Sequence, residues 1–269
     1  MILMTVVCSG QHKMRFNSGH SAQISLMKVL DNQEFLVSAT LAGQVYLYDL
    51  NKKRALWNTS INNVIWDITI SESYVIVASF DGVSFLDKKS GKLVEKLAAP
   101  NMALSGGKLS KGGKYYISQE PQFTARVQGT EYVQLWDLEN KKMLWRVEAD
   151  LQRFWTYSFS NDTQFVFGGD YAGNIWKWDI SNGSQLFRTK INSNRINDLC
   201  ISKDGEWIYT ASAYGDLAKV DANNGKIEGS FPNSDTDEGN FSIGVTPDGA
   251  LLFKGGEQGN KPTLTIYEP

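Results

Sequence analysis

Few residues of this sequence have side chains suited to metal binding or nucleophilic catalysis. The 269 residues include only two histidines, His12 and His20, and two cysteines, Cys8 and Cys200. A multi-histidine metal site is therefore excluded, and no Cys-x-x-Cys pair is present. Cys200 alternates with apolar residues, which predicts a cysteine buried in a strand rather than a nucleophile. We expect no catalytic residue, no metal site and no cofactor.

A segment rich in glycine and lysine, residues 105–114, has the residue types of a phosphate-binding loop. Its spacing differs from that of the P-loop, and no strand-to-helix pattern follows it. We therefore predict a turn between two strands.

Acidic residues recur at the ends of short segments in which apolar and polar residues alternate. They are Asp49, Asp87, Asp137, Asp179 and Asp221. A group that recurs in nearly every copy of a pattern has a structural role, because an active site occurs once. We interpret these residues as turn residues whose carboxylates accept local backbone N–H groups.

The segments that end in these acids are copies of an internal repeat. Positions 48, 86, 136, 178, 220 and 267, taken in the same register, are separated by 38, 50, 42, 42 and 47 residues. Each copy comprises short strands divided by glycine-containing and polar turns. Strand repeats of this length are typical of propeller blades. The predicted fold class is all-β, a β-propeller of four-stranded antiparallel blades.

Six segments qualify as the inner strands of blades: residues 24–30, 64–70, 103–109, 154–160, 196–202 and 241–246. We predict six blades. Seven blades are the alternative, because residues 2–7 also align with the third strand of a blade, and every third strand of the six blades is already assigned. Residues 13–17 would complete the last blade, closing the ring by pairing N- and C-terminal strands. Residues 1–269 would then form a single domain; the alternative is one domain of a larger protein.

Several of these segments resemble WD-repeat β-propellers. The resemblance rests on Gly19-His20, Tyr48-Asp49, Trp136-Asp137, Trp178-Asp179 and the Thr246-Pro247-Asp248-Gly249 turn. It implies a structural role for His20, bonded within its blade. The repeats are degenerate, since Ala42 stands where the first blade of that family would have an aspartate. Residues 81–92 resemble, more weakly, the repeats of pyrroloquinoline-quinone propellers.

One level of the predicted inner strands is rich in aromatic residues. It contains Ser25, Trp66, Ser105, Trp155, Asn197 and Phe241, and Arg153 and Arg195 precede two of these by two residues. Loops at one end of the inner strands meet on one face, and aromatic residues with arginines are typical of binding hot spots. We predict a partner-binding face formed by Trp66, Arg153, Trp155, Arg195 and Phe241. The alternative is that the tryptophans only wedge between blades.

The next level along the strands contains two acids, Asp67 and Asp198. In a ring of six blades these residues would face each other across the axial channel. They are therefore candidates for holding a cation or a polar ligand, and the alternative is a channel filled with water.

The composition limits the partners that we expect. The chain has 27 Lys+Arg and 29 Asp+Glu, so a basic surface for nucleic acid is not expected. No apolar run approaches the length of a spanning helix, and two cysteines favour a reduced compartment. We predict a cytoplasmic, non-catalytic scaffold that binds a protein partner and neither membrane nor nucleic acid. The alternative is a propeller that binds a small ligand, or acts as a hydrolase or lyase, in its channel.

Overall fold

The computed structural model describes residues 22–29, 34–97, 107–119, 132–150, 153–214, 216–231, 238–245, 252–258 and 261–267. The chain divides into two compact units, residues 1–100 and 101–269. The predictions for His12, His20, Cys8 and residues 2–7 and 13–17 lie outside the described residues. Within the described ranges, no helix has the length and apolar character required to cross a membrane.

Unit 1 contains two four-stranded antiparallel sheets, here called blades 1 and 2. Blade 1 consists of β1 (Ile24–Val29), β2 (Phe35–Thr40), β3 (Gln44–Asp49) and β4 (Arg54–Ser60). Blade 2 consists of β5 (Ile65–Ile70), β6 (Tyr74–Ser79), β7 (Gly82–Asp87) and β8 (Leu93–Leu97). Each strand pairs with the next one in sequence, and the first strands of the two blades, β1 and β5, are in contact.

Unit 2 contains three more four-stranded sheets, blades 3 to 5, and one three-stranded sheet. Blade 3 consists of β9 (Lys108–Leu109), the 3-10 turn η1 (Lys111–Gly113), β10 (Tyr115–Gln119), β11 (Tyr132–Asp137) and β12 (Lys142–Glu148). Blade 4 consists of β13 (Phe154–Phe159), β14 (Phe165–Asp170), β15 (Asn174–Asp179) and β16 (Gln185–Lys190). Blade 5 consists of β17 (Ile196–Ile201), β18 (Trp207–Ser212), β19 (Leu217–Asp221) and β20 (Ile227–Phe231). The last sheet consists of β21 (Glu238–Val245), β22 (Leu252–Gln258) and β23 (Lys261–Tyr267).

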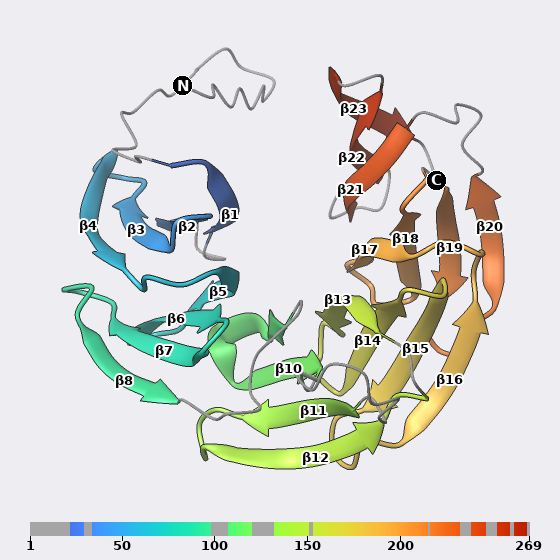
Figure 1. Cartoon of the computed structure of the whole chain (residues 1–269), viewed down its shortest axis with the longest axis horizontal. Coiled ribbons are helices and arrows are strands. Elements are labelled where there is room, and N and C mark those ends of the chain that lie inside the picture. The colour runs from blue at the N-terminus through green and yellow to red at the C-terminus, as the bar shows by residue number, and fades with distance from the viewer. Residues whose placement is uncertain are drawn as a thin grey trace, which may run out of the picture. The chain divides into compact units, whose positions relative to one another are not determined.

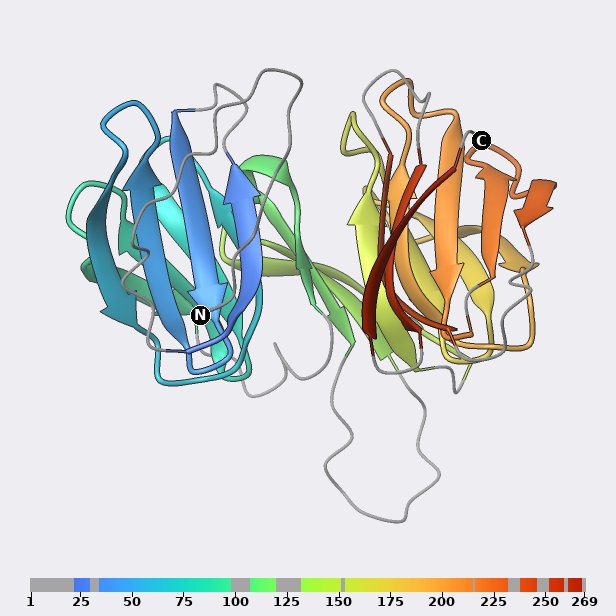
Figure 2. The ribbon, with the colours of Figure 1, turned by 90° about the horizontal axis from the view of Figure 1, so that it is seen from above.

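The predicted fold class is confirmed: the chain is nearly all β, and five of its sheets are four-stranded antiparallel meanders of the kind that form propeller blades. Within unit 2, β13 contacts β9 and β17, and β17 contacts β21, so the first strands of successive sheets lie side by side (Figure 1). Within each sheet, successive strands run antiparallel, which is clearest when the molecule is turned (Figure 2). The number of blades, the closure of the ring and the single domain stay predictions.

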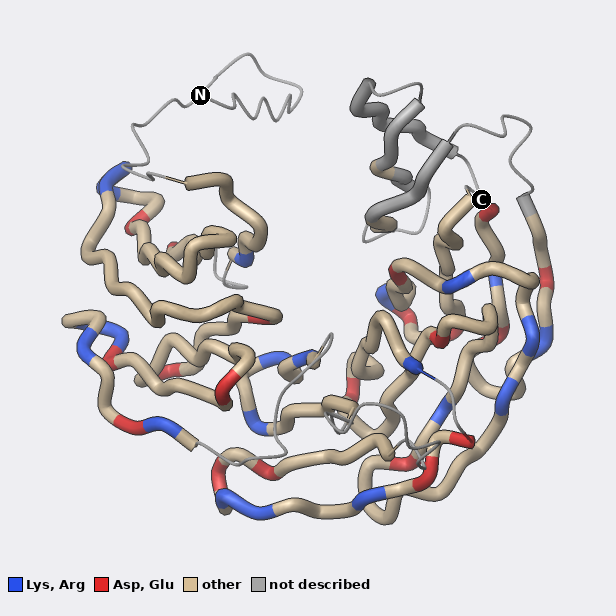
Figure 3. The backbone as a smooth tube through the Cα atoms, viewed as in Figure 1, with Lys and Arg blue, Asp and Glu red and all other residues tan. Residues whose placement is uncertain are grey.

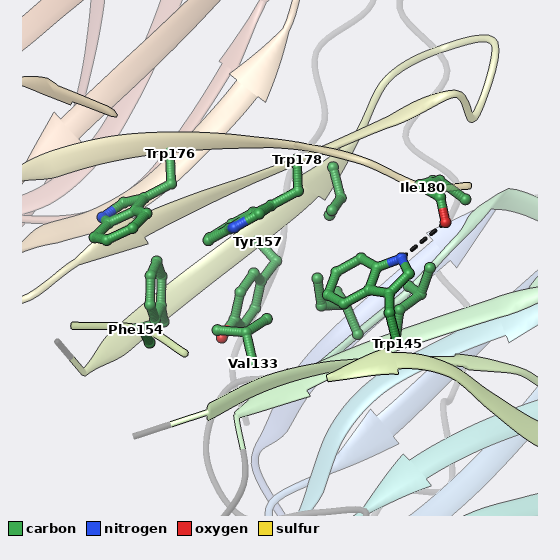
Figure 4. Close-up of a cluster of buried hydrophobic side chains, with 11 residues drawn as sticks. Val133, Trp145, Phe154, Tyr157, Trp176, Trp178 and Ile180 are labelled. Atoms are coloured by element: carbon green, nitrogen blue, oxygen red, sulfur yellow. Dashed lines mark hydrogen bonds between the residues drawn. The ribbon is translucent and has the colours of Figure 1, made fainter. Parts of the chain in front are cut away.

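Within each unit, apolar side chains that alternate along the strands form cores between successive blades. Between blades 3 and 4, Val133 packs with Phe154, Tyr157, Trp176 and Trp178 (Figure 4). The two tryptophan rings are stacked with their centroids 5.6 Å apart, and both are almost fully buried. Burial of large aromatic surfaces provides much of the stability of such an interface.

A second contact between blades recurs at the outer strands. The ring of Trp57 on β4 lies against Gly91 in the turn after β7, and its Nε1 donates to the carbonyl of Lys88 at 2.9 Å. Trp145 on β12 packs on Gly183 in the same way and donates to the carbonyl of Ile180 at 2.8 Å (Figure 4). An outer-strand aromatic residue therefore fixes each of these blades to a turn of the next blade.

Charged residues of both signs are interspersed along each unit (Figure 3). This distribution agrees with the formal net charge of −2. Any binding of a charged ligand therefore depends on local groups of residues rather than on the field of the whole chain.

Candidate functional site

The aromatic level predicted from the sequence corresponds to a repeated backbone feature. In five inner strands, the pairing with the second strand of the sheet skips one residue, which is the mark of a β-bulge. The residues at the bulge are Ser25, Trp66, Trp155, Asn197 and Phe241. These positions are therefore equivalent, and a bulge re-aims the side chain that it carries. The Phe241 side chain lies outside the described part of the structure, so its predicted role in binding stays a prediction.

Four side chains gather at the bulge of blade 4, and we call Arg153, Trp155, Tyr171 and Arg195 the Arg–Trp cluster. The Trp155 ring meets the Tyr171 ring edge-on, with centroids 5.6 Å apart and an interplanar angle of 77°. The Arg195 guanidinium lies 4.2 Å from the Trp155 centroid and 5.2 Å from that of Tyr171. The Arg153 guanidinium lies 5.7 Å from the Tyr171 centroid. Trp155 is 45% exposed and Tyr171 40% exposed, so both rings remain accessible.

Hydrogen bonds hold the guanidinium of Arg195 and the backbone of Arg153 in the Arg–Trp cluster. The Nε of Arg195 donates to Oδ1 of Asn197 at 2.7 Å, so the bulge residue of blade 5 directs this arginine onto the bulge residue of blade 4. The carbonyl of Arg153 accepts the N–H of Tyr171 at 2.8 Å, which joins the start of β13 to the β14–β15 turn. Neither guanidinium forms an ion pair with an acidic residue of the described chain. Such an arrangement can stack on an apolar group and pair with a carboxylate.

Trp66 occupies the same bulge position in blade 2 of unit 1. Its side chain is only partly accessible, and its Nε1 is buried without a hydrogen-bond partner among the described residues. The positions equivalent to Arg153 and Tyr171 are taken by Val64 and Phe80, which are 44% and 42% exposed. The start of the inner strand therefore has cationic and aromatic neighbours in blade 4 and apolar neighbours in blade 2.

The two acids proposed for the channel each join strands within their own unit. Asp67 is 1% exposed; the Nζ of Lys28 on β1 donates to its Oδ2 at 3.1 Å and forms an ion pair with its Oδ1 at 2.9 Å. Asp198 accepts the N–H groups of Leu199 at 2.9 Å and Ile243 at 3.1 Å, and the hydroxyl of Thr156 at 3.4 Å. Asp198 therefore joins β13, β17 and β21. A ligand-binding role for either residue stays a prediction.

Burial raises the pKa of Asp198 above its ordinary value. The hydrogen bonds from Ile243 and Leu199, together with the positive charge of Lys108, oppose this rise. Burial likewise raises the pKa of the Cys200 thiol to about 12, which keeps it protonated and unreactive. Within the described chain, no group of three or more His, Cys, Asp or Glu side chains is placed to hold a metal ion.

The recurring acids lie at the last position of the third strand of each of blades 1 to 5. Asp49, Asp137 and Asp179 each accept a backbone N–H two or three residues further on, from Lys52, Asn140 and Ser181, at 2.7–2.9 Å. These hydrogen bonds hold the pKa of Asp49 and Asp137 below its usual range. Their carboxylates thus support turns.

Two residues of the site region were missed by the sequence analysis. In the sequence, Tyr171 is an ordinary residue of a turn before Gly173. In the structure it contacts the other three members of the Arg–Trp cluster. Asp170 is fully buried and accepts three hydrogen bonds, from the N–H and Nδ2 of Asn174 and from Nε1 of Trp176, at 2.7–2.8 Å. The Asp-x-x-x-Asn-x-Trp spacing was the available sign of that network.

The blades and their contacts can now be compared with known proteins. A family model described as "Outer membrane protein assembly factor BamB" matches residues 10–228. The chain belongs to this family. The matched range contains Trp66 and the whole Arg–Trp cluster, whereas Phe241 lies beyond it. No curated protein matches the chain.

Membership of the BamB family bears on the two resemblances found in the sequence. It favours the repeats of the pyrroloquinoline-quinone type, noted at residues 81–92, over those of the WD type. In blade 1, Ser38 and Tyr48 form a hydrogen bond, and burial raises the pKa of Tyr48 to about 12. In WD-repeat blades a histidine takes part in the same set of hydrogen bonds. The corresponding residue here, His20, lies outside the described residues, so the WD-repeat identity stays a prediction.

Proposed function

We propose that this chain is a non-catalytic interaction platform that binds a protein partner through the Arg–Trp cluster. The observation that carries the proposal is that two exposed aromatic rings and two guanidinium groups form one group where the inner strands of blades 4 and 5 begin. Tryptophan, tyrosine and arginine are the residues most enriched among binding hot spots.

The chemistry of the Arg–Trp cluster suggests what the partner presents. Neither arginine has an acidic partner in the described chain, so a carboxylate of the partner would supply the missing charge. The exposed faces of Trp155 and Tyr171 would cover an apolar side chain beside that carboxylate. The family's printed name is that of an assembly factor, which supports binding to other proteins as the function.

Site-specific photo-crosslinking in the native cell tests this proposal. A photoreactive residue in place of Tyr171 should give a discrete crosslinked protein, and one in place of Leu186, 47% exposed on β16, should not. The crosslink should be lost when Trp155→Ala and Arg195→Ala are added. Equal crosslinking at both sites, or a crosslink that survives the double substitution, would contradict the proposal.

The compartment is part of the same proposal. The sequence favoured the cytoplasm and no contact with a membrane, whereas the family's printed name refers to outer membrane proteins. Fractionation of cells that make the full chain, followed by immunoblotting of each fraction, would decide between the two.

A further inference from the structure

A cavity in unit 2 lies away from the Arg–Trp cluster. It has a volume of about 360 Å³ and lies where β9, the end of β13 and the β17–β18 turn come together. Arg153 and Trp155 stand at the start of β13, whereas Ser158, Phe159 and Ser160 at its other end line the cavity. The five residue steps from Phe154 to Phe159 span roughly 17 Å of extended chain.

Three lysines line this cavity. Lys108 comes from β9, Lys111 from η1 and Lys203 from the β17–β18 turn, so three separate segments each contribute one positive charge. None of the lining residues is acidic, and Lys203 forms no ion pair within the described ranges. The nearby carboxylate of Asp198 is engaged by hydrogen bonds from Ile243 and Leu199, as described above. The lining itself thus has three lysines and no acidic residue.

Uncharged hydrogen-bonding groups complete the lining. Ser158, Ser160 and Asn161 all line the cavity. Asn161 Nδ2 donates to the carbonyls of Ser202 at 2.8 Å and Lys203 at 2.9 Å, which ties the β13–β14 turn to the β17–β18 turn. Ser160 Oγ accepts the N–H of Phe165 at 2.9 Å and donates to Oδ1 of Asp162 at 2.6 Å. The backbone that positions Lys203 is thus fixed before any ligand arrives, which reduces the ordering cost of binding.

We propose that this cavity binds a phosphate group, as inorganic phosphate or as the monoester of a small metabolite. Lysine ammonium groups pair with phosphate as point charges, and the hydroxyl of Ser158 donates to one of its oxygens. The volume, at the lower end of the range for ligand sites, suits a small ligand. Leu109 and Phe159 supply an apolar wall for the carbon skeleton of an ester.

The sequence contained part of this site. Lys108 and Lys111 belong to residues 105–114, whose composition resembled a phosphate-binding loop. The structure places them in a strand and a 3-10 turn rather than before a helix, so the P-loop geometry is absent from the described part of this segment. The lysines instead reach the cavity from blade 3, and Lys203 of blade 5 joins them there.

Titration of the full chain, followed by amide NMR at constant ionic strength, tests the proposal. Inorganic phosphate and glycerol 3-phosphate should each give saturable shifts at residues 158–161 and 203. Tighter binding of the ester would identify a phosphomonoester as the ligand, and equal binding would identify the phosphate ion. No saturable shift at these residues, or the same shifts with chloride, would overturn the proposal.

Substitutions distinguish phosphate binding in the cavity from a general effect of the protein's net charge. Lys203→Gln should weaken phosphate binding roughly tenfold, because one charge-assisted contact is lost, while Lys203→Arg retains most of the affinity. Lys142→Gln, which removes a charge from an exposed position of β12 outside the cavity, serves as the matched control and should have no effect. Equal affinities for Lys203→Gln and Lys142→Gln would overturn the proposal.

Discussion

Blade 2 of unit 1 and blade 4 of unit 2 share a framework and differ at the face where their inner strands begin. Both have a tryptophan at the bulge, Trp66 and Trp155. In blade 4 the ring is exposed, meets Tyr171 edge-on and lies against the Arg195 guanidinium, whereas in blade 2 the indole nitrogen is buried. The same residue at the same position therefore has two roles, and the flanking residues decide which one it has.

The second strands of the two blades end in residues that hold the following turn. Asp170→Ala in blade 4 would leave three donors of Asn174 and Trp176 without an acceptor in a buried place. We expect it to lower the free energy of unfolding by about 3–5 kcal/mol. The equivalent Ser79→Ala in blade 2 removes two weaker contacts, to Asp81 and to the carbonyl of Gly82, and should cost about 1 kcal/mol. Urea denaturation measures both, and equal losses would contradict this account.

The contact of an outer aromatic ring with a turn glycine should be equally important in both blades. A Cβ at Gly91 would lie 2.6 Å from the Trp57 ring, and one at Gly183 would lie 2.8 Å from the Trp145 ring. Gly91→Ala and Gly183→Ala should each cost about 2–4 kcal/mol, through both a clash and the positive φ.

Gly112→Ala is the control for these two substitutions. Gly112 has a φ of 74°, but no atom lies within 4 Å of an added Cβ. Only backbone strain remains, so the loss of stability should be about 1 kcal/mol. Equal melting temperatures for all three variants would show that the rings do not press on the glycines.

The two tryptophans should separate stability from binding. Trp66→Ala removes a partly buried ring and should lower the free energy of unfolding by about 2 kcal/mol. Trp155→Ala removes a ring that is 45% exposed and should cost about 1 kcal/mol or less, while abolishing partner capture. Denaturation and crosslinking on the same samples check both statements, and a greater loss of stability for Trp155→Ala would reverse the comparison.

The buried acid of blade 5 should give the smallest effect, one that depends on pH. Because the pKa of Asp198 is raised, the folded protein takes up a proton before the unfolded chain as the pH falls. The wild type should therefore gain stability relative to Asp198→Asn as the pH falls through the raised pKa toward 3.8. The slope should not exceed that of one proton, about 1.4 kcal/mol per pH unit.

Asp204 provides a control of opposite sign. A hydrogen bond from Ser202 lowers the pKa of Asp204, so its contribution to stability is present above the ordinary value and disappears as the pH falls through the lowered pKa. Thermal denaturation of both asparagine variants, followed above pH 3.8 for Asp198 and below pH 3.8 for Asp204, should show opposite trends. Parallel trends would contradict the assigned role of burial at Asp198.

Much of the framework could be predicted from the sequence because alternation and turn residues repeat. The starts of the inner strands of blades 1, 2, 4 and 5, the acids that end the third strands and the level shared by Trp66 and Trp155 all follow from one register, whereas β21 begins three residues before its predicted start. The exposure of Trp155 and the burial of the Trp66 nitrogen could not be predicted, since they depend on residues from separate turns. Likewise, Lys177 reads as a surface lysine of β15, yet it is 4% exposed and donates to the carbonyl of Ala222 in blade 5 at 2.7 Å.

The placement of Trp57 against Gly91, and of Trp145 against Gly183, has an evolutionary consequence. In both cases one blade supplies a tryptophan on its outer strand and the next blade supplies a glycine in its last turn. The same two elements therefore join each of these pairs of blades. A duplicated blade inserted between two others could form the same contact between tryptophan and glycine with its neighbours. Chains built in this way can change length by whole repeats during descent, while the face that meets a partner diverges separately in each copy.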